Sequence, residues 1–145
     1  MFAAPYQLTQ ASEIGAVPGS GAYSGPGVTP GGLFDPALTG PGTFIIKYTF
    51  TSTTGGCVDT LSKTIIVYQP PVADFTFSTT ICETKPITFT DASTTPVGVL
   101  TTWTWDFGDG TPLVVRNNNT PFTHVFSNWG NYNVTLRVTT SNGCV

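Results

Sequence analysis

A repeated pattern of a glycine, an alternating segment and a hairpin constrains the fold of this chain most. The first copy spans residues 42–50 and is followed by a turn and Gly56-Cys57, and the second spans 130–138 and is followed by Gly143-Cys144. Alternate positions are apolar in both copies, which is typical of a strand with one face on a core. The copies lie about 87 residues apart, so two tandem β-sandwich domains fit better than a solenoid with repeats of about 20–50 residues. The alternating residues are Phe44, Ile46, Tyr48 and Phe50 in the first copy and Tyr132, Val134, Leu136 and Val138 in the second.

Composition also favours an all-β chain. Only 9% of the residues are charged, against about 25% in an average protein, so uncharged polar residues must cover the surface. No window shows the 3.6-residue apolar periodicity of a helix. Alternation predicts further strands at 73–77, 87–89 and 102–107, and the segment 15–41, rich in glycine and proline, predicts loops around short strands at 22–24 and 33–34.

Two consecutive prolines mark the predicted domain boundary. A second strand at 60–68 runs up to them, and proline ends ladder pairing. We therefore predict a first domain at 1–69, a Pro-Pro linker at 70–71 and a second domain at 72–145. The first domain leaves little room for its first strands and the second stops where its last strand would begin, so we expect a fragment of a longer array. The edge left by that strand predicts strand addition from another chain.

Charge and hydropathy argue against several classes of partner. The net charge is −3 and the five Lys and Arg residues are scattered, so no basic patch is available to neutralise the phosphates of a nucleic acid. No apolar run approaches the roughly 20 residues that span a bilayer, and residues 1–5 lack the features of a signal peptide. We expect neither nucleic-acid binding nor membrane insertion.

Residues 72–145 resemble the PKD family. The residues that carry the resemblance are Trp105-Asp106-Phe107-Gly108-Asp109-Gly110, then the segment 120–126 with His124, then the segment 130–136 with Tyr132. The resemblance implies an immunoglobulin-like β-sandwich, and we expect the aromatic residues at 105 and 107 to anchor its core and the neighbouring aspartate to bond the turn. We expect the glycines to permit the bend, Tyr132 to form a tyrosine corner and His124 to act as a structural hydrogen-bond donor.

Three cysteines give an odd count, and their spacing fits no metal site. Cys82 lies just before the strand at 87–89, and Cys144 opens the final strand, so we predict a Cys82–Cys144 disulfide, with two buried free thiols as the alternative. Loop closure of that size is worth on the order of 4 kcal/mol. The odd count predicts that Cys57 has lost its partner upstream or carries a free thiol.

Residues 20–68 are similar to the glycine- and proline-rich repeats of large Bacteroidota surface proteins. The segments that carry this resemblance are Tyr23–Val28, Phe34-Asp35-Pro36 and Gly40–Thr43. With a PKD module beside it, such a repeat resembles adhesins and gliding-associated proteins exported by type nine secretion, which implies the outer surface of a Gram-negative bacterium. Asp59-Thr60-Leu61 also resembles the O-glycosylation pattern of that group, so Thr60 is a candidate for modification.

Functional interpretations of the remaining polar and aromatic residues compete with structural ones. Asp106 and Asp109, with Asn117–Asn119, are weak calcium candidates, but we expect turn-capping aspartates and no cofactor. His124 beside an aspartate suggests acid–base chemistry, yet no nucleophile with a base and an orienter is recognisable. Trp103 shares a face with Trp105 and favours burial, whereas Trp129 lies in a loop and is the better ligand contact.

Two functions follow from these observations, and neither is enzymatic. The first is a structural or adhesive spacer of a secreted repetitive cell-surface or filament protein, whose partners are the neighbouring repeat modules, a surface polysaccharide or another cell-surface protein. The alternative is a carbohydrate-binding accessory module of a secreted hydrolase. The alternative predicts retention on polysaccharide that falls on Trp129→Ala.

Overall fold

The computed structural model describes residues 4–9, 17–78 and 84–145. Its secondary structure is β-strand apart from one short helix, α1 (Pro36–Thr39), so the all-β prediction is confirmed. The chain divides into two compact units, Met1–Tyr68 and Gln69–Val145, called here the N-terminal and C-terminal units. That both are immunoglobulin-like domains, with the predicted boundaries, stays a prediction.

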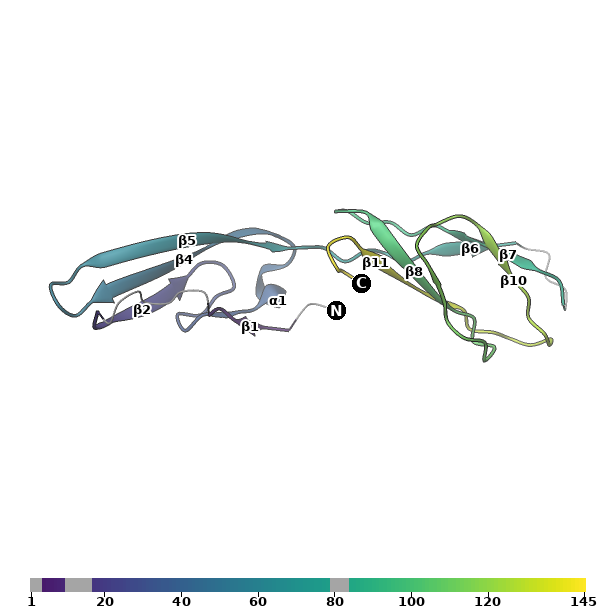
Figure 1. The fold of residues 1–145 in the computed structure, drawn as a ribbon, viewed down its shortest axis with the longest axis horizontal. Coiled ribbons are helices and arrows are strands. Elements are labelled where there is room, and N and C mark those ends of the chain that lie inside the picture. The colour runs from purple at the N-terminus through teal and green to yellow at the C-terminus, as the bar shows by residue number, and fades with distance from the viewer. Residues whose placement is uncertain (1–3, 10–16, 79–83) are drawn as a thin grey trace. The chain divides into compact units, whose positions relative to one another are not determined.

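The N-terminal unit is built on one three-stranded antiparallel sheet (Figure 1). Its strands are β2 (Gly19–Ser24), β4 (Gly42–Ser52) and β5 (Val58–Val67), in the order β2-β4-β5. The strand predicted at 42–50 therefore forms the centre of the sheet. The strand predicted at 60–68 corresponds to β5, which lies at the edge of the sheet. It begins two residues earlier than predicted, with Val58 opposite Thr51, and ends one residue earlier, at Val67.

A second, smaller layer of this unit pairs β1 (Tyr6–Gln7) with β3 (Leu33–Phe34). Phe34 is buried, and its ring meets that of Tyr6 edge to face at 5.7 Å. Helix α1 follows at once because Asp35 caps it, accepting a hydrogen bond from Ala37 N at 2.9 Å, while Pro36 opens it. Four residues are too few for helical periodicity, so the sequence did not predict this helix.

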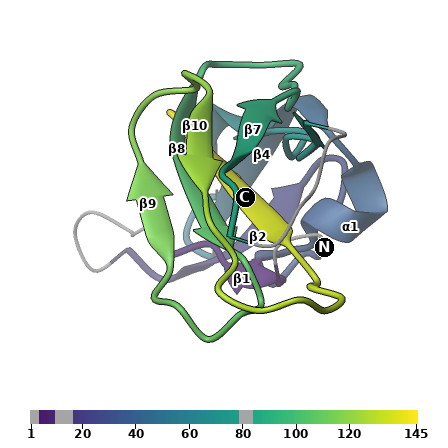
Figure 2. The same cartoon turned by 90° about the vertical axis from the view of Figure 1, so that its right-hand side faces the viewer.

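The C-terminal unit contains two three-stranded antiparallel sheets (Figure 2). One sheet has the order β10-β7-β6, with β10 (Phe122–His124), β7 (Ile87–Asp91) and β6 (Phe75–Phe77). The other has the order β11-β8-β9, with β11 (Thr135–Thr140), β8 (Leu100–Asp106) and β9 (Val114–Arg116). Among the described strands, β11 pairs only with β8.

Aromatic side chains from both sheets form the core of this unit. Phe89 on β7 meets Trp105 on β8 edge to face at 5.7 Å, so the two sheets pack face to face as a sandwich. Trp105 and Phe107 are 2% and 1% exposed, and Trp103 is buried as expected from its shared face. The buried cluster consists of Ile87, Phe89, Trp103, Trp105, Phe107, Phe126 and Val138.

One predicted strand begins later than expected. The sequence pattern predicts a strand from Gly130, but β11 begins only at Thr135. The alternation continues into the earlier residues, because Tyr132 and Val134 pack against the core. Their backbone nevertheless is not part of the β11 strand. The Tyr132 hydroxyl donates to Asn128 O at 2.8 Å, and this hydrogen bond fixes a corner in the chain before β11 begins. Side-chain periodicity shows which residues point to the core, but it does not show whether their backbone is hydrogen-bonded to another strand.

Within the described ranges, no helix is long and apolar enough to cross a membrane.

Candidate functional site

The motif segment leaves β8 at Asp106 and turns through two glycines. The Asp106 Oδ1 atom accepts a hydrogen bond from Gly108 N at 2.9 Å, as expected for a turn-capping aspartate. Gly108 has φ 67°, and a Cβ there would lie 2.7 Å from Asn133 O. Gly110 also has positive φ, 83°, but open space surrounds it. The first glycine is therefore required by both conformation and space, the second by conformation alone.

Asp109 is the most fully bonded side chain of the turn. Its Oδ1 accepts from the backbone N of Thr111 at 3.0 Å and from the Thr111 hydroxyl at 2.5 Å. Its Oδ2 lies 2.7 Å from His124 Nε2 on β10. The carboxylate thus ties the turn after β8, in one sheet, to a strand of the other sheet.

The His124 ring is held between aromatic rings. It stacks on Phe107 with centroids 3.7 Å apart and an interplanar angle of 2°, and Phe126 meets its edge at 4.8 Å. The side chains of His124 and Asp109 are only 14% and 7% exposed. This geometry presents the imidazole to the core and the carboxylate, and leaves little of it available to a substrate.

The pKa of Asp109 is lowered by these contacts. Burial by itself would raise it, but hydrogen bonds from the Thr111 and His124 side chains, the backbone hydrogen bond from Thr111 and the charge attraction of His124 outweigh burial. Together they lower the pKa from 3.8 to about 2. The carboxylate is therefore ionised throughout the physiological pH range.

The oxygens suspected of calcium binding have other partners. Asn118 Oδ1 accepts from Arg116 Nη2 at 3.1 Å and from Thr120, so a guanidinium group already neighbours this oxygen. The same guanidinium lies 4.5 Å from the centroid of the Phe122 ring. In the described parts of the chain no group of three His, Cys, Asp or Glu side chains could hold a metal ion. The calcium hypothesis stays a prediction without a ligand cluster.

Tyr132 forms the corner that leads into β11. Its hydroxyl donates to the carbonyl oxygen of Asn128, four residues upstream, and its ring stacks on Phe126 at 4.3 Å and 21°. Asn128 and Tyr132 flank an exposed loop whose tip is Trp129. The corner therefore holds the base of the loop on the core.

Trp129 is 86% exposed and stands beside an open groove of about 570 Å³. We call it the Trp129 groove. Its floor is apolar and comes from β6, β7 and the core, whereas its rim carries Lys85 and three asparagines. As a ligand contact the sequence singled out only Trp129, because asparagines are common in turns and by themselves indicate no site. The groove is lined by Phe75, Phe77, Lys85, Ile87, Phe89, Phe126, Asn128, Trp129, Gly130, Asn131, Tyr132, Asn133 and Val134.

The cysteines give no disulfide among the described residues. Cys57 is exposed with a free thiol, and Cys144 is half-buried, also with a free thiol. Cys82 lies outside the described residues. The predicted Cys82–Cys144 bridge therefore stays a prediction.

Comparison with known proteins gives a family match. A family model described as PKD domain matches residues 68–145 of the chain. Neither the curated proteins nor the solved structures include a significant match. The match covers the whole C-terminal unit, including the motif, His124, the tyrosine corner and the Trp129 groove.

Proposed function

The chain belongs to the PKD domain family, and from this membership we propose that it is a non-catalytic structural or adhesive spacer of a secreted, repetitive cell-surface or filament protein. PKD domains are typically non-catalytic immunoglobulin-like modules and occur in extracellular or surface proteins. The proposal assigns to this chain the role of holding neighbouring repeat modules, its principal partners, in position.

The use of the polar motif residues supports the proposal most directly. Asp109 and His124 bond each other at 2.7 Å across the two sheets, and Asp106 bonds the turn glycine. Groups that could carry proton transfer are thus already engaged in joining strands. A residue that acts on a substrate needs a free lone pair or proton within about 3 Å of the reacting atom.

We extend the proposal to the cellular setting. The repeat segments Tyr23–Val28 and Gly40–Thr43 support a Bacteroidota surface protein exported by type nine secretion, on the outer surface of a Gram-negative cell, with gliding or adhesion as its process. Thr60, whose backbone N donates to Asp59 Oδ1 at 2.8 Å on the exposed strand β5, is the proposed O-glycosylation site. A glycan mass on the peptide containing Thr60 from native material supports this assignment, and an unmodified peptide refutes it.

A replacement experiment in the parent protein tests the spacer function. Residues 69–145 are deleted in one strain and exchanged in another for an unrelated β-sandwich of similar length. We expect the deletion to reduce adhesion or filament function and the exchange to restore it, because a spacer acts through length and stiffness. Surface display of both variants is measured by antibody labelling of intact cells.

The opposite outcome contradicts the proposal. If the exchanged protein is displayed normally but remains as defective as the deletion, the surface of residues 69–145 carries a specific contact. The Trp129→Ala variant is the matched control, since it changes the most exposed aromatic ring of the described residues without changing length.

The Trp129 groove favours one alternative function, a carbohydrate-binding accessory module. An exposed indole offers a flat apolar face to a sugar ring, and the amides of Asn128, Asn131 and Asn133 supply donors and acceptors at the rim. In this alternative the partner is a surface polysaccharide.

Retention on insoluble polysaccharides tests the alternative. We expect Trp129→Ala to lose at least tenfold in retention and Trp129→Phe to keep part of it, because phenylalanine retains an aromatic face. Leu38→Ala, at an exposed apolar position of α1, is the control. Equal retention of the wild type and the three variants, or none by the wild type, rules out this role.

A further inference from the structure

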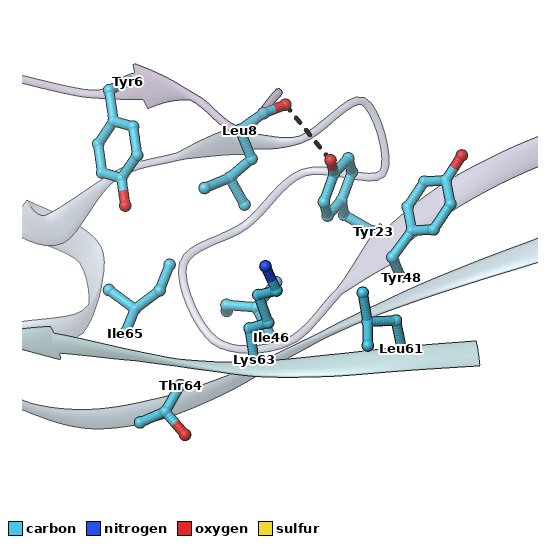
Figure 3. A pocket seen from close by; sticks show the side chains of 9 residues that line it. All are labelled: Tyr6, Leu8, Tyr23, Ile46, Tyr48, Leu61, Lys63, Thr64 and Ile65. Carbon is cyan, nitrogen blue, oxygen red and sulfur yellow. Dashed lines mark hydrogen bonds between the residues drawn. The ribbon is translucent and has the colours of Figure 1, made fainter. Parts of the chain in front are cut away.

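A second cavity lies in the N-terminal unit, outside the PKD match. It occupies about 270 Å³ between the sheet of β4 and β5 and the segment that carries β1 (Figure 3). Three tyrosine rings and one lysine surround it, and we call it the tyrosine cavity. Its lining consists of Tyr6, Leu8, Tyr23, Ile46, Tyr48, Leu61, Lys63, Thr64 and Ile65.

Strand register places Lys63 on the apolar face of the sheet. Lys63 on β5 is directly opposite Ile46 on β4, and the neighbouring pair on this face joins Leu61 with Tyr48. Opposed residues of an antiparallel pair share a face. The other lysine of this sheet, Lys47, pairs with Ser62 and therefore lies on the opposite face. Lys63 is therefore flanked on this face by Leu61 and Ile65. The next charged residue of β5 on the same face is Asp59, four positions away and opposite Phe50.

The Lys63 ammonium has no carboxylate partner among the residues that the structure describes. The ion pair found there joins His124 to Asp109 in the other unit. Asp and Glu are absent from the lining of the tyrosine cavity. Figure 3 shows the Lys63 side chain rising from β5 toward Leu8 and Tyr23, whereas Thr64 points away from the cavity. The cavity therefore presents one positive charge over an apolar floor.

The tyrosine rings are fixed by neighbours. Tyr23 lies 4.9 Å from Tyr48 at a tilt of 58°, and its hydroxyl donates to Leu8 O at 3.4 Å. Tyr6 packs edge to face on Phe34, and Figure 3 shows its hydroxyl directed toward the cavity. Fixed rings lose little side-chain entropy when a ligand stacks on them.

We propose that the tyrosine cavity binds an acidic sugar, a hexuronate unit of a polysaccharide. The carboxylate pairs with the Lys63 ammonium, the C–H face of the sugar ring packs on tyrosine, and phenol hydroxyls bond sugar hydroxyls. A volume of 270 Å³ is at the lower end of the roughly 300–1,000 Å³ of small-molecule sites, so the cavity holds one sugar unit. A fatty acid would bury its chain in a deeper, wholly apolar cavity.

Calorimetric titration of the whole chain with trigalacturonate tests this inference, with the neutral galactotriose as the matched ligand. We expect trigalacturonate to bind at least tenfold more tightly than galactotriose, and less tightly as salt is raised. Lys63→Met keeps the apolar stem and removes the charge, so it should remove this preference, whereas Lys63→Arg should keep most of it. Lys47→Met, on the opposite face, should bind as the wild type does.

Two results overturn the inference. One is equal affinity of the wild type for the acidic and the neutral trisaccharide, including no binding of either at millimolar concentration. The other is unchanged trigalacturonate affinity in Lys63→Met. Unfolding temperatures of all variants are measured in parallel, and Trp129→Ala should leave this binding unchanged, so failure here leaves the spacer function and the Trp129 groove untouched.

Discussion

In the C-terminal unit two sheets turn aromatic side chains toward each other, whereas the apolar face of β2, β4 and β5 in the N-terminal unit buries one large side chain, Ile46, among the described residues. Both units nevertheless use the same alternation in their longest strands. The difference lies in what opposes the sheet. In the C-terminal unit each sheet is covered by a three-stranded partner sheet. In the N-terminal unit the two-stranded layer of β1 and β3 covers only part of the sheet of β2, β4 and β5.

The degree of cover also accounts for the tyrosine cavity of the N-terminal unit. The covered sheet becomes a core, and its polar residues are used to fix turns. The partly covered sheet keeps an open cavity lined by tyrosines and Lys63. Stability is therefore expected to concentrate in the C-terminal unit, and all three tryptophans (Trp103, Trp105 and Trp129) lie there, so tryptophan fluorescence reports on that unit alone.

Trp105→Ala should have the largest effect on stability. The side chain is 2% exposed and contacts Phe75, Phe89 and Phe122, so its removal leaves a large cavity. We expect a loss of about 3–5 kcal/mol in the free energy of unfolding of the C-terminal unit. Urea denaturation followed by the fluorescence of the remaining tryptophans measures it. A loss below about 1 kcal/mol would mean that the aromatic cluster is not the core that holds this unit.

Gly108→Ala should destabilise the same unit by about 3 kcal/mol, through positive φ together with the contact of its Cβ with Asn133 O. Gly110→Ala is the matched control, because its φ is also positive but its Cβ meets open space. Its loss should be about 1 kcal/mol. Equal losses of stability in the two variants, measured by urea denaturation, would mean that the contact between a Cβ at position 108 and Asn133 O does not contribute.

Ile46→Ala tests the same comparison in the N-terminal unit. Ile46 is the buried hydrophobic side chain among the described residues of the partly covered sheet, and we expect a loss of about 2 kcal/mol, because neighbours and water can fill the space. Hydrogen exchange read by mass spectrometry over peptides of β4 and β5 measures it, since this unit contains no tryptophan. A loss as large as that of Trp105→Ala would show that the N-terminal unit has a core of equal weight.

The smallest expected effect on stability is the pH-dependent contribution of Asp109. The pKa of Asp109 is about 2 in the folded protein and near 3.8 without its partners, so its stabilising contribution is present above pH 3.8 and disappears as pH falls through 2. We expect the stability difference between wild type and Asp109→Asn to shrink over this interval. Urea denaturation from pH 5 to pH 2 measures it, with Asp106→Asn as a more exposed control. A difference that stays constant with pH would contradict the lowered pKa.

Much of the strand arrangement follows from the sequence. Alternation identified the centre of β4 and both tryptophans of β8 that face inward, because a side-chain period of two needs no tertiary information. The short β3 followed instead from its place between glycines and prolines. The predicted strands did not include β9, in which two apolar residues are adjacent, or β10, which lies within the segment that carries the family motif. Alternation also placed the start of β11 at Gly130, because side chains continue to alternate toward the core in residues whose backbone is not paired with another strand.

The sequence by itself determined which residues face a core and which motif turns the chain, because periodicity, glycine and aspartate act locally. Tertiary structure decided which residues meet. The stacking of His124 on Phe107, its contact with Asp109 and the position of Lys63 opposite Ile46 join segments far apart along the chain. Strand register and sheet packing set these pairs, and no local pattern encodes either one uniquely.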